Sequence, residues 1–162
     1  PDMIQKLQDE DALPTQLYLS TNAADYESFI KINKPKYDDS WERWNRTLDM
    51  LKNLDTRTVL RITLIRNYND QKEMIPAFAD MFRKASPHFI EIKSYMHIGR
   101  STNRLEHENM LEMHEVKKFS EQIAKQSKIF SIMDESLVSR ISILQNNERF
   151  IDRWIPTYAN TN

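Results

Sequence analysis

The sequence predicts an α/β fold in which parallel strands alternate with outer helices and form part of a barrel. Three stretches alternate apolar and polar residues with a period of two, which is typical of strands: 15–21, 58–66 and 88–97. Stretches with helical periodicity separate them, and strands that alternate with helices favour a parallel sheet. Each strand keeps polar residues on one face, where a covering helix would leave them unpaired at a cost of about 1–3 kcal/mol each. A barrel with a polar interior avoids this cost.

The composition excludes several classes of function. The chain has 162 residues, enough for one modest domain, and its net charge of -1 gives no overall attraction to nucleic acid or membranes. It has no cysteine, so this chain cannot form disulfides or bind an iron–sulfur cluster through its own thiolates. A single glycine rules out a glycine-rich phosphate loop. No apolar run is long enough to span a bilayer, and no signal-peptide pattern opens the chain, so we expect a cytoplasmic and monomeric protein.

We expect a single partial domain over residues 1–162, in three parts. Residues 1–11 carry apolar residues at helical spacing and are expected to be the remnant of a helix. Residues 12–125 hold the βα units, and residues 126–162 hold C-terminal strands and a tail. Because the chain starts with proline inside a helical pattern, we expect it to begin within a longer protein.

Four helices are predicted from apolar residues spaced three and four positions apart. They cover 22–32, which Asn33-Lys34-Pro35 ends; 41–54, capped by Asp39 or Ser40; 76–84; and 114–126. Stretches 128–133 and 137–145 are expected to be two strands joined at 134–136, and the tail with Trp154, Pro156 and Tyr158 is expected to pack on the outside. Residues 100–110 form a polar loop after the third strand, the end at which βα barrels carry their sites.

The stretch Pro87–Gly99 is the centre of the functional prediction. Its strand, 88–97, places five residues on one face: Phe89, Glu91, Lys93, Tyr95 and His97. The opposite face carries Ile90, Ile92, Ser94 and Met96. The first face lies either in bulk water or in an enclosed polar cavity, and the polar faces of the other two strands favour the cavity.

The sequence resembles the radical S-adenosylmethionine (SAM) family in its motifs. Ser20-Thr21-Asn22 with Asp25-Tyr26 and Phe29-Ile30-Lys31 is similar to the fourth-strand segment of that superfamily. Within it, the closest resemblance is to the 4-demethylwyosine synthases of the wybutosine pathway, particularly the archaeal type. Their pattern is matched, in order, by Gln16–Ser20, Asp39–Arg43, Arg57–Leu64, Tyr68-Asn69, Phe89–Gly99 and Met113–Glu115.

The resemblance implies a lyase that modifies tRNA. Such enzymes use a [4Fe–4S] cluster and SAM to join pyruvate-derived carbons to N1-methylguanosine in tRNA-Phe. It also implies that the cysteine loop, the SAM-amine motif and the pyruvate-reactive lysine precede the matched stretch, so only the C-terminal half of the barrel is matched. We therefore expect this chain to be a fragment that is inactive alone. Two alternatives remain: another radical SAM enzyme acting on a small molecule, or a cysteine-free binding module without catalysis.

Four residues are candidates for binding SAM. Ser20 ends its strand, where a hydroxyl can bond the SAM ribose or cap the next helix. Arg61 can hold the SAM carboxylate in a two-pronged hydrogen bond, or pair with Glu91. Thr63 is a second hydroxyl or an ordinary strand threonine, and Asn69 binds the cofactor or only forms a turn.

The candidates for the substrate follow the third strand. Lys93 is the predicted catalytic residue, contacting the substrate or pyruvate, with a structural pair to Glu91 or to an aspartate as the alternative. Tyr95 and His97 point the same way nearer the mouth, and Arg100 and Arg104 can meet tRNA phosphates or belong to a solvated loop. His107 and His114 do not form a convincing metal pair, so no metal site is predicted within the chain.

Overall fold

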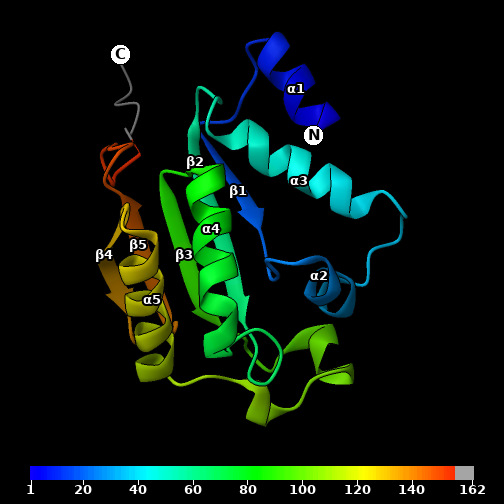
Figure 1. Ribbon diagram of the computed structural model, residues 1–162, viewed down its shortest axis with the longest axis vertical. Helices are drawn as coiled ribbons and strands as arrows, with labels where there is room; N and C mark the ends of the chain where they lie inside the picture. Colours follow the sequence, from blue (N-terminus) through cyan, green and yellow to red (C-terminus); the bar gives the residue numbers. More distant parts are fainter. Residues whose placement is uncertain (156–162) are drawn as a thin grey trace, which may run out of the picture.

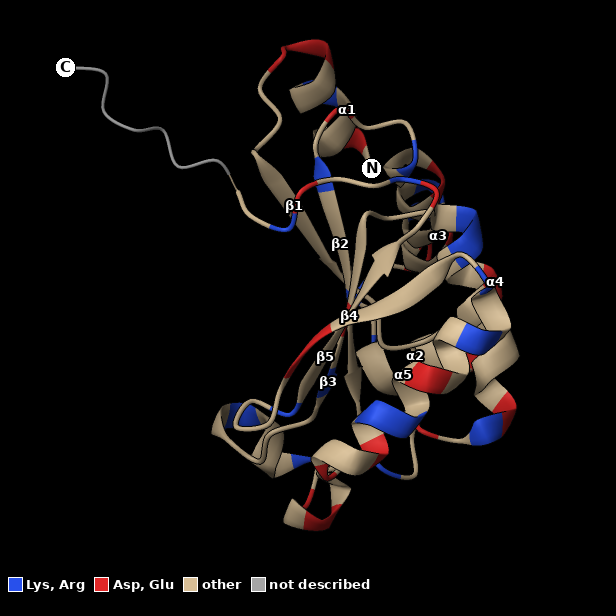
Figure 2. Ribbon diagram, turned by 90° about the vertical axis from the view of Figure 1, so that its left-hand side faces the viewer, with Lys and Arg blue, Asp and Glu red and all other residues tan. Residues whose placement is uncertain are grey.

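The fold is one mixed sheet of five strands with helices packed mainly on one side (Figures 1 and 2). The computed structural model describes residues 1–155. The strand order is β1-β2-β3-β5-β4, in which β1 to β3 are parallel and β5 runs antiparallel to both β3 and β4. The bounds are β1 Gln16–Ser20, β2 Arg57–Leu64, β3 Phe89–Ser94, β4 Phe130–Ser136 and β5 Ile141–Asn146. The three predicted parallel strands are confirmed as adjacent and parallel.

Within residues 1–155, five helices and three short 3₁₀ turns accompany the strands. The helices are α1 Asp2–Asp9, α2 Tyr26–Asn33, α3 Ser40–Leu51, α4 Ile75–Ala85 and α5 Met113–Ser127. The turns are η1 Lys72–Met74, η2 Gly99–Asn103 and η3 His107–Asn109. Asp39 precedes α3 but makes no capping bond, because its carboxylate accepts a hydrogen bond from Arg43 Nε at 2.7 Å. None of the helices within residues 1–155 is long and apolar enough to cross a membrane.

The hydrophobic core lies between the sheet and the helices α3, α4 and α5. Leu60, Ile62 and Ile90 of the central strands are fully buried there, as are Phe78 and Phe82 of α4. Burying an aliphatic or aromatic side chain of this size contributes about 1.5–3 kcal/mol, so the alternate residues of each strand fix which face meets the helices.

The opposite face of the sheet carries the predicted polar residues, together with the buried apolar residues Val59 and Phe89. Residues paired across neighbouring strands point to the same face. Ser20 pairs with Arg61, which pairs with Glu91, and one step on Thr63 pairs with Lys93. The register therefore confirms that the four predicted residues Ser20, Arg61, Thr63 and Lys93 share one face. Figure 2 shows this side of the sheet without a covering helix among residues 1–155, so the sheet is an open part of a barrel and not a closed one.

The segment after β5 crosses the amino-terminal end of this open face. The Arg57 guanidinium donates hydrogen bonds to the carbonyls of Asp152, Arg153 and Trp154. The Trp154 ring is 69% exposed, with the Arg153 guanidinium 4.6 Å from its centre. Of the tail residues expected to pack on the outside, Pro156 and Tyr158 lie outside the described residues.

The third strand is shorter than the predicted 88–97. β3 ends at Ser94, whose hydroxyl donates to the Tyr95 carbonyl and accepts a hydrogen bond from Leu111 N–H. The alternation of faces stops there: Tyr95 is buried with Ile65 and Leu105, whereas Met96, expected on the buried face, is 37% exposed. The prediction for 95–97 was wrong because side-chain packing turns the chain out of the sheet.

The C-terminal strands also differ from the prediction. Residues 134–136, expected to join two strands, belong to β4, which contains an irregularity between Ile132 and Asp134. The turn lies at 137–140 and uses a left-handed Arg140 with φ of 49°. The polar Asp-Glu-Ser sequence resembles a turn, but on an edge strand with one open face polar side chains remain in contact with water.

His88 generates a prediction about stability. Its Nδ1 accepts a hydrogen bond from Thr58 N–H at 3.1 Å, which requires an unprotonated nitrogen. Burial, followed by the positive charges of Arg149 and Arg57, lowers the pKa of His88 to about 4. Between pH 4 and the unfolded pKa of about 6.5, the unfolded state binds more protons, so stability falls as the pH is lowered through this range.

We expect His88→Asn to remove this pH dependence, because an amide oxygen accepts the Thr58 hydrogen bond without titrating. In urea unfolding, the free energy of unfolding of the wild type should fall by about 1–2 kcal/mol more than that of the variant between pH 7.5 and pH 4. This figure is smaller than the full effect of the pKa shift because water partly reaches His88. The exposed His107→Asn serves as the matched control. Parallel profiles for wild type and His88→Asn would contradict the assignment.

Candidate substrate and cofactor site

A pocket of about 350 Å³ opens at the carboxyl ends of β2 and β3. Four of the predicted site residues line it: Thr63, Lys93, Tyr95 and Arg104. Its other walls come from the segment after β1 and from residues 96–105, and include Asn22, Ile65, Ser101 and Leu105. Parallel βα folds bind ligands at this end of their strands, which makes the pocket a candidate ligand site.

The Arg61–Glu91 ion pair lies next to this pocket, in the row of paired residues below Thr63 and Lys93. Arg61 Nε is 2.8 Å from Glu91 Oε1, and Nη2 is 3.4 Å from Oε2. The Glu91 side chain is 8% exposed and the Arg61 side chain 37% exposed. The ion pair considered for Arg61 is therefore present, and Nη1 makes no hydrogen bond within residues 1–155.

Tyr18 completes this group on β1. The Arg61 guanidinium lies 4.6 Å from the centre of the Tyr18 ring, a cation–π contact. Burial, followed by the negative charge of Glu91, raises the pKa of Tyr18, so its phenol stays protonated at neutral pH. Three side chains from three neighbouring strands thus form one connected polar group.

Lys93 is half-buried in the wall of the pocket. It makes no ion pair within residues 1–155, and Glu91, its expected structural partner, is paired with Arg61. A half-buried ammonium without an internal partner favours a negatively charged or carbonyl-bearing ligand.

Asn69 is fully buried behind the pocket and orders its wall. Its Oδ1 accepts from Ile65 N–H at 2.7 Å, and its Nδ2 donates to the carbonyls of Asn22 and Thr63, both at 2.9 Å. Asn22 Oδ1 in turn accepts from Thr63 N–H at 3.0 Å. In this arrangement both amide hydrogens of Asn69 bind backbone, so Asn69 joins the segment after β1 to the end of β2.

The remaining predicted residues lie around the rim. The Tyr95 hydroxyl and His97 Nδ1 are 3.1 Å apart, and the His97 and His107 rings are 6.2 Å apart. Ser20 and Arg100 are exposed, and Ser20, His97 and Arg100 do not line the pocket. Of the nine predicted site residues, four line the pocket, Arg61 and Asn69 lie next to it or behind it, and Ser20, His97 and Arg100 are outside its lining.

Sequence reasoning gave no role to Asn22, Ser101 or Tyr18. Asn22 follows the end of β1, and an asparagine directly after a strand is a signal that could have been used. Tyr18 has the same face as Ser20 but no local signal connects it to Arg61. Ser101 enters the wall only through the fold of the 95–112 segment.

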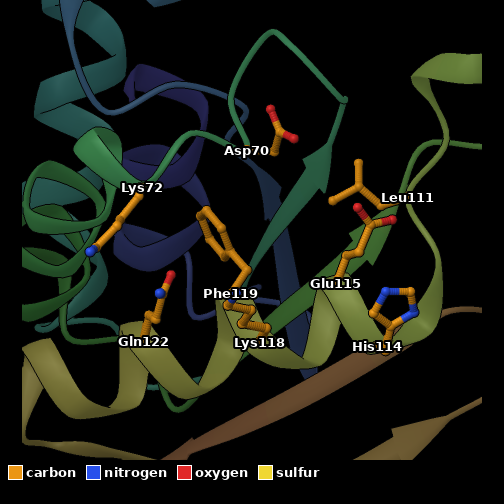
Figure 3. A pocket seen from close by; sticks show the side chains of 8 residues that line it. All are labelled: Asp70, Lys72, Leu111, His114, Glu115, Lys118, Phe119 and Gln122. Carbon is orange, nitrogen blue, oxygen red and sulfur yellow. The ribbon is translucent and has the colours of Figure 1, made fainter.

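A second cleft, of about 370 Å³, lies on the helical side (Figure 3). His114, Glu115 and Lys118 of α5 form one wall, and Asp70 and Lys72 of the segment after β2 lie across from them. None of the predicted site residues lines this cleft.

The residues present do not fit an iron–sulfur cluster. The chain has no cysteine, and residues 1–155 contain no group of three or more His, Asp or Glu side chains arranged to hold a metal ion. The chain does fit a ligand with hydroxyl and carboxylate groups, because hydroxyls, an ammonium and a guanidinium edge meet at the strand ends.

Fold and pocket together describe an α/β protein with the architecture of part of a βα barrel, and with a pocket of polar and apolar residues at the carboxyl ends of parallel strands. Residues 84–146 match the family model described as Wyosine base formation. The S-adenosyl-L-methionine-dependent tRNA 4-demethylwyosine synthase of Methanocaldococcus jannaschii is 41% identical over 153 residues, 93% of this chain and 45% of the relative. That of Pyrococcus abyssi is 36% identical over 148 residues, 91% of this chain and 43% of the relative.

Solved structures agree with these relatives. A structure of TYW1 with a lysine–pyruvate adduct bound matches this chain with a TM-score of 0.78 and 40% sequence identity. The match covers 88% of this chain and 44% of that protein chain. A crystal structure of archaeal TYW1 has a TM-score of 0.70 and 36% identity, over 90% and 45%. The chain is therefore homologous to part of the tRNA 4-demethylwyosine synthases, the family that its motifs resemble. It spans less than half the length of these relatives.

The Arg61–Glu91 pair predicts an asymmetry between its two partners. Arg61→Ala leaves the buried Glu91 carboxylate unpaired, and we expect a loss of about 2 kcal/mol, below the usual figure for buried pairs because water reaches Arg61. Glu91→Gln leaves a more exposed guanidinium and should cost about 1 kcal/mol. Urea unfolding at pH 7 measures both.

Arg43→Ala, which removes an exposed helical pair with Asp39, is the control and should have little effect. Equal losses for Arg61→Ala and Glu91→Gln would show that Glu91 is not the buried, dependent partner.

Proposed function

We propose that this chain forms the SAM- and tRNA-facing part of a radical SAM tRNA 4-demethylwyosine synthase. The observation that carries this proposal is the pocket itself. In a chain similar to these synthases over most of its length, it places Thr63, Lys93 and Arg104 around one cavity, with Arg61 beside it. Each of these groups complements a part of SAM, of pyruvate or of a modified guanosine.

SAM is assigned to the side of the pocket formed by β1 and β2. The hydroxyls of Ser20 and Thr63 can bond a ribose, and Arg61 Nη1 can bond the methionyl carboxylate while Nε and Nη2 hold Glu91. When bound, SAM supplies the 5′-deoxyadenosyl group that begins the family's reaction. Asn69 acts here as a positioning residue for Thr63.

The substrate is assigned to the side formed by β3. One similar structure contains a lysine–pyruvate adduct, and the family resemblance places the lysine of that reaction before the matched stretch. We therefore assign Lys93 a non-covalent contact with the pyruvate-derived carboxylate or with the guanine carbonyl. An ammonium at this position neutralises negative charge that develops beside it.

The tRNA is assigned to the rim. Arg104 lines the pocket and Arg100 lies exposed beside it, so both can meet phosphates that flank the modified nucleotide. Tyr95 and His97, joined at 3.1 Å, offer a polar edge to the base or its phosphate. Because no cysteine is present, another part of the enzyme must supply the cluster ligands.

This division of roles predicts that SAM and RNA binding are separable. Arg61→Lys keeps the charge but cannot hold Glu91 and a second carboxylate through separate donors, and should weaken SAM binding by about ten- to a hundredfold with little effect on RNA. Lys93→Ala should do the reverse. Equilibrium dialysis with labelled SAM, and anisotropy with an anticodon stem-loop containing N1-methylguanosine, measure the two affinities.

Lys125→Ala, an exposed lysine of α5, is the matched control, and thermal melts establish that each variant is folded. If the wild type binds neither probe, the proposed function is wrong. If both variants lose both ligands equally, the assignment of separate sides is wrong.

The absence of cysteine gives a second prediction. After incubation with iron and sulfide, the chain should show no absorbance of an iron–sulfur cluster in the visible region. After reduction with dithionite in the presence of SAM, it should form no 5′-deoxyadenosine above a no-protein control. A cluster-containing radical SAM enzyme is the positive control. Product above background would mean that cluster ligation does not depend on cysteines from elsewhere.

A further inference from the structure

Arg66, the second residue after β2, connects three separate parts of the structure. Its side chain donates to the Glu108 carbonyl through Nε at 3.0 Å and to the Met110 carbonyl through Nη2 at 3.0 Å. Its Nη1 and Nη2 also contact both carboxylate oxygens of Glu115 at 2.6 Å. One guanidinium thus joins the end of β2, the segment before α5 and the first turn of α5.

The backbone of Arg66 strengthens the same connection. Arg66 N–H donates to the Asn109 carbonyl at 2.9 Å, and Asn109 Nδ2 donates back to the Arg66 carbonyl at 3.1 Å. Glu115 Oε2 also accepts from Glu112 N–H at 2.8 Å, which closes the first turn of α5. Figure 3 shows Glu115 on α5 beside Leu111, the residue after Met110.

The segment held in this way is 95–112, which carries the rim of the pocket. It contains only two short 3₁₀ turns, so it depends on side chains for its position. Tyr95 at its start and Leu105 in its middle pack with Ile65 in a small apolar cluster separate from the main core. Near its end, Arg66 supplies two hydrogen bonds to carbonyls. Ser101 and Arg104, which line the pocket, lie between Tyr95 and Leu105 and precede the carbonyls that Arg66 binds.

The pKa shifts and the burial of Arg66 and Glu115 both agree with a strong ion pair between them. The hydrogen bonds that Arg66 donates to Glu115 lower the pKa of the Glu115 carboxyl and raise the pKa of Arg66. Both side chains are about one-third exposed or less, at 34% and 28%. Charge-assisted hydrogen bonds with fork geometry are among the stronger contacts available to a loop.

We propose that Arg66 is a positioning residue: it holds the 95–112 segment in the arrangement that presents Arg104 and His97 to an RNA ligand, without touching that ligand. This inference rests on the proposed function. It adds a residue that lies outside the pocket and that sets the affinity of the rim through backbone carbonyls.

Arg66→Lys keeps the charge and cannot make the fork, and Glu115→Gln keeps the shape and removes the charge. Arg83→Lys is the matched control, since Arg83 also bridges a carboxylate, Asp80, and a carbonyl, that of Gln126, but belongs to α4 and does not line the pocket. The charge-swapped pair Arg66→Glu with Glu115→Arg restores attraction to α5 but leaves residue 66 without donors for the carbonyls of Glu108 and Met110.

Three measurements are made on the chain: trypsin cleavage after Arg100 and Arg104, amide exchange of 95–112 against β2 and β3, and affinity for the N1-methylguanosine stem-loop. Losing one charge-assisted bond changes a local equilibrium by roughly ten- to a hundredfold, so Arg66→Lys should speed cleavage and exchange in 95–112 at least about tenfold. RNA affinity should fall in parallel, and the swapped pair should not restore it.

The outcomes separate the inference from the proposed function. A wild type that does not bind the stem-loop overturns the proposed function. A wild type that binds, together with an Arg66→Lys variant whose segment opens while its affinity stays unchanged, overturns the inference. An affinity that falls with no change in cleavage or exchange also overturns it, because Arg66 would then contact the RNA directly.

Discussion

The alternation of side chains along β1, β2 and β3 is the constraint on which the rest of this structure depends. One set of faces, including Leu60, Ile62 and Ile90, is fully buried against the helices. The other set carries the Arg61–Glu91 ion pair in the middle of the sheet, where a covering helix would remove both charges from water at high cost. The open face is therefore the only place where this polar row is compatible with a stable fold, and it ends at the pocket.

In that row, the Arg61 guanidinium both stabilises the fold and is proposed to bind the ligand. Glu91 is nearly buried and needs Arg61, while the proposed ligand brings a second carboxylate to the same residue. Arginine resolves this because its donors form a planar fork: Nε and Nη2 face Glu91, and Nη1 remains for another partner. A lysine ammonium is a single point charge without this fork, so it would have to share one charged group between two carboxylates. The sequence alone allowed either role for Arg61, and the geometry makes the two compatible.

The spacing of apolar and polar residues predicted the features of the fold that depend on short stretches of the chain. The three parallel strands, the four main helices and the shared face of Ser20, Arg61, Thr63 and Lys93 all follow from spacing along the chain. The predicted strand position of Tyr95 was wrong, because its burial depends on contacts with Ile65 and Leu105. The alternation of residues along a strand does not reveal these contacts. Asn69 resembles an ordinary turn residue, and only the tertiary contact with Asn22 and Thr63 shows that it is buried and fully bonded.

The loops show a further pattern that follows from the scarcity of glycine. With one glycine in the chain, left-handed conformations at turns are carried by residues such as Asn67, Ser86 and Arg140.

Arginines then satisfy the carbonyls of irregular segments. Arg57 bonds three carbonyls after β5, Arg140 bonds that of Leu111, and Arg66 bonds those of Glu108 and Met110. Such loops are rigid only as long as each guanidinium keeps its partners, because the backbone itself supplies few bonds. Where the loop is also the wall of a ligand pocket, as at 95–112, the contacts that order the backbone and the contacts that bind a ligand become energetically linked.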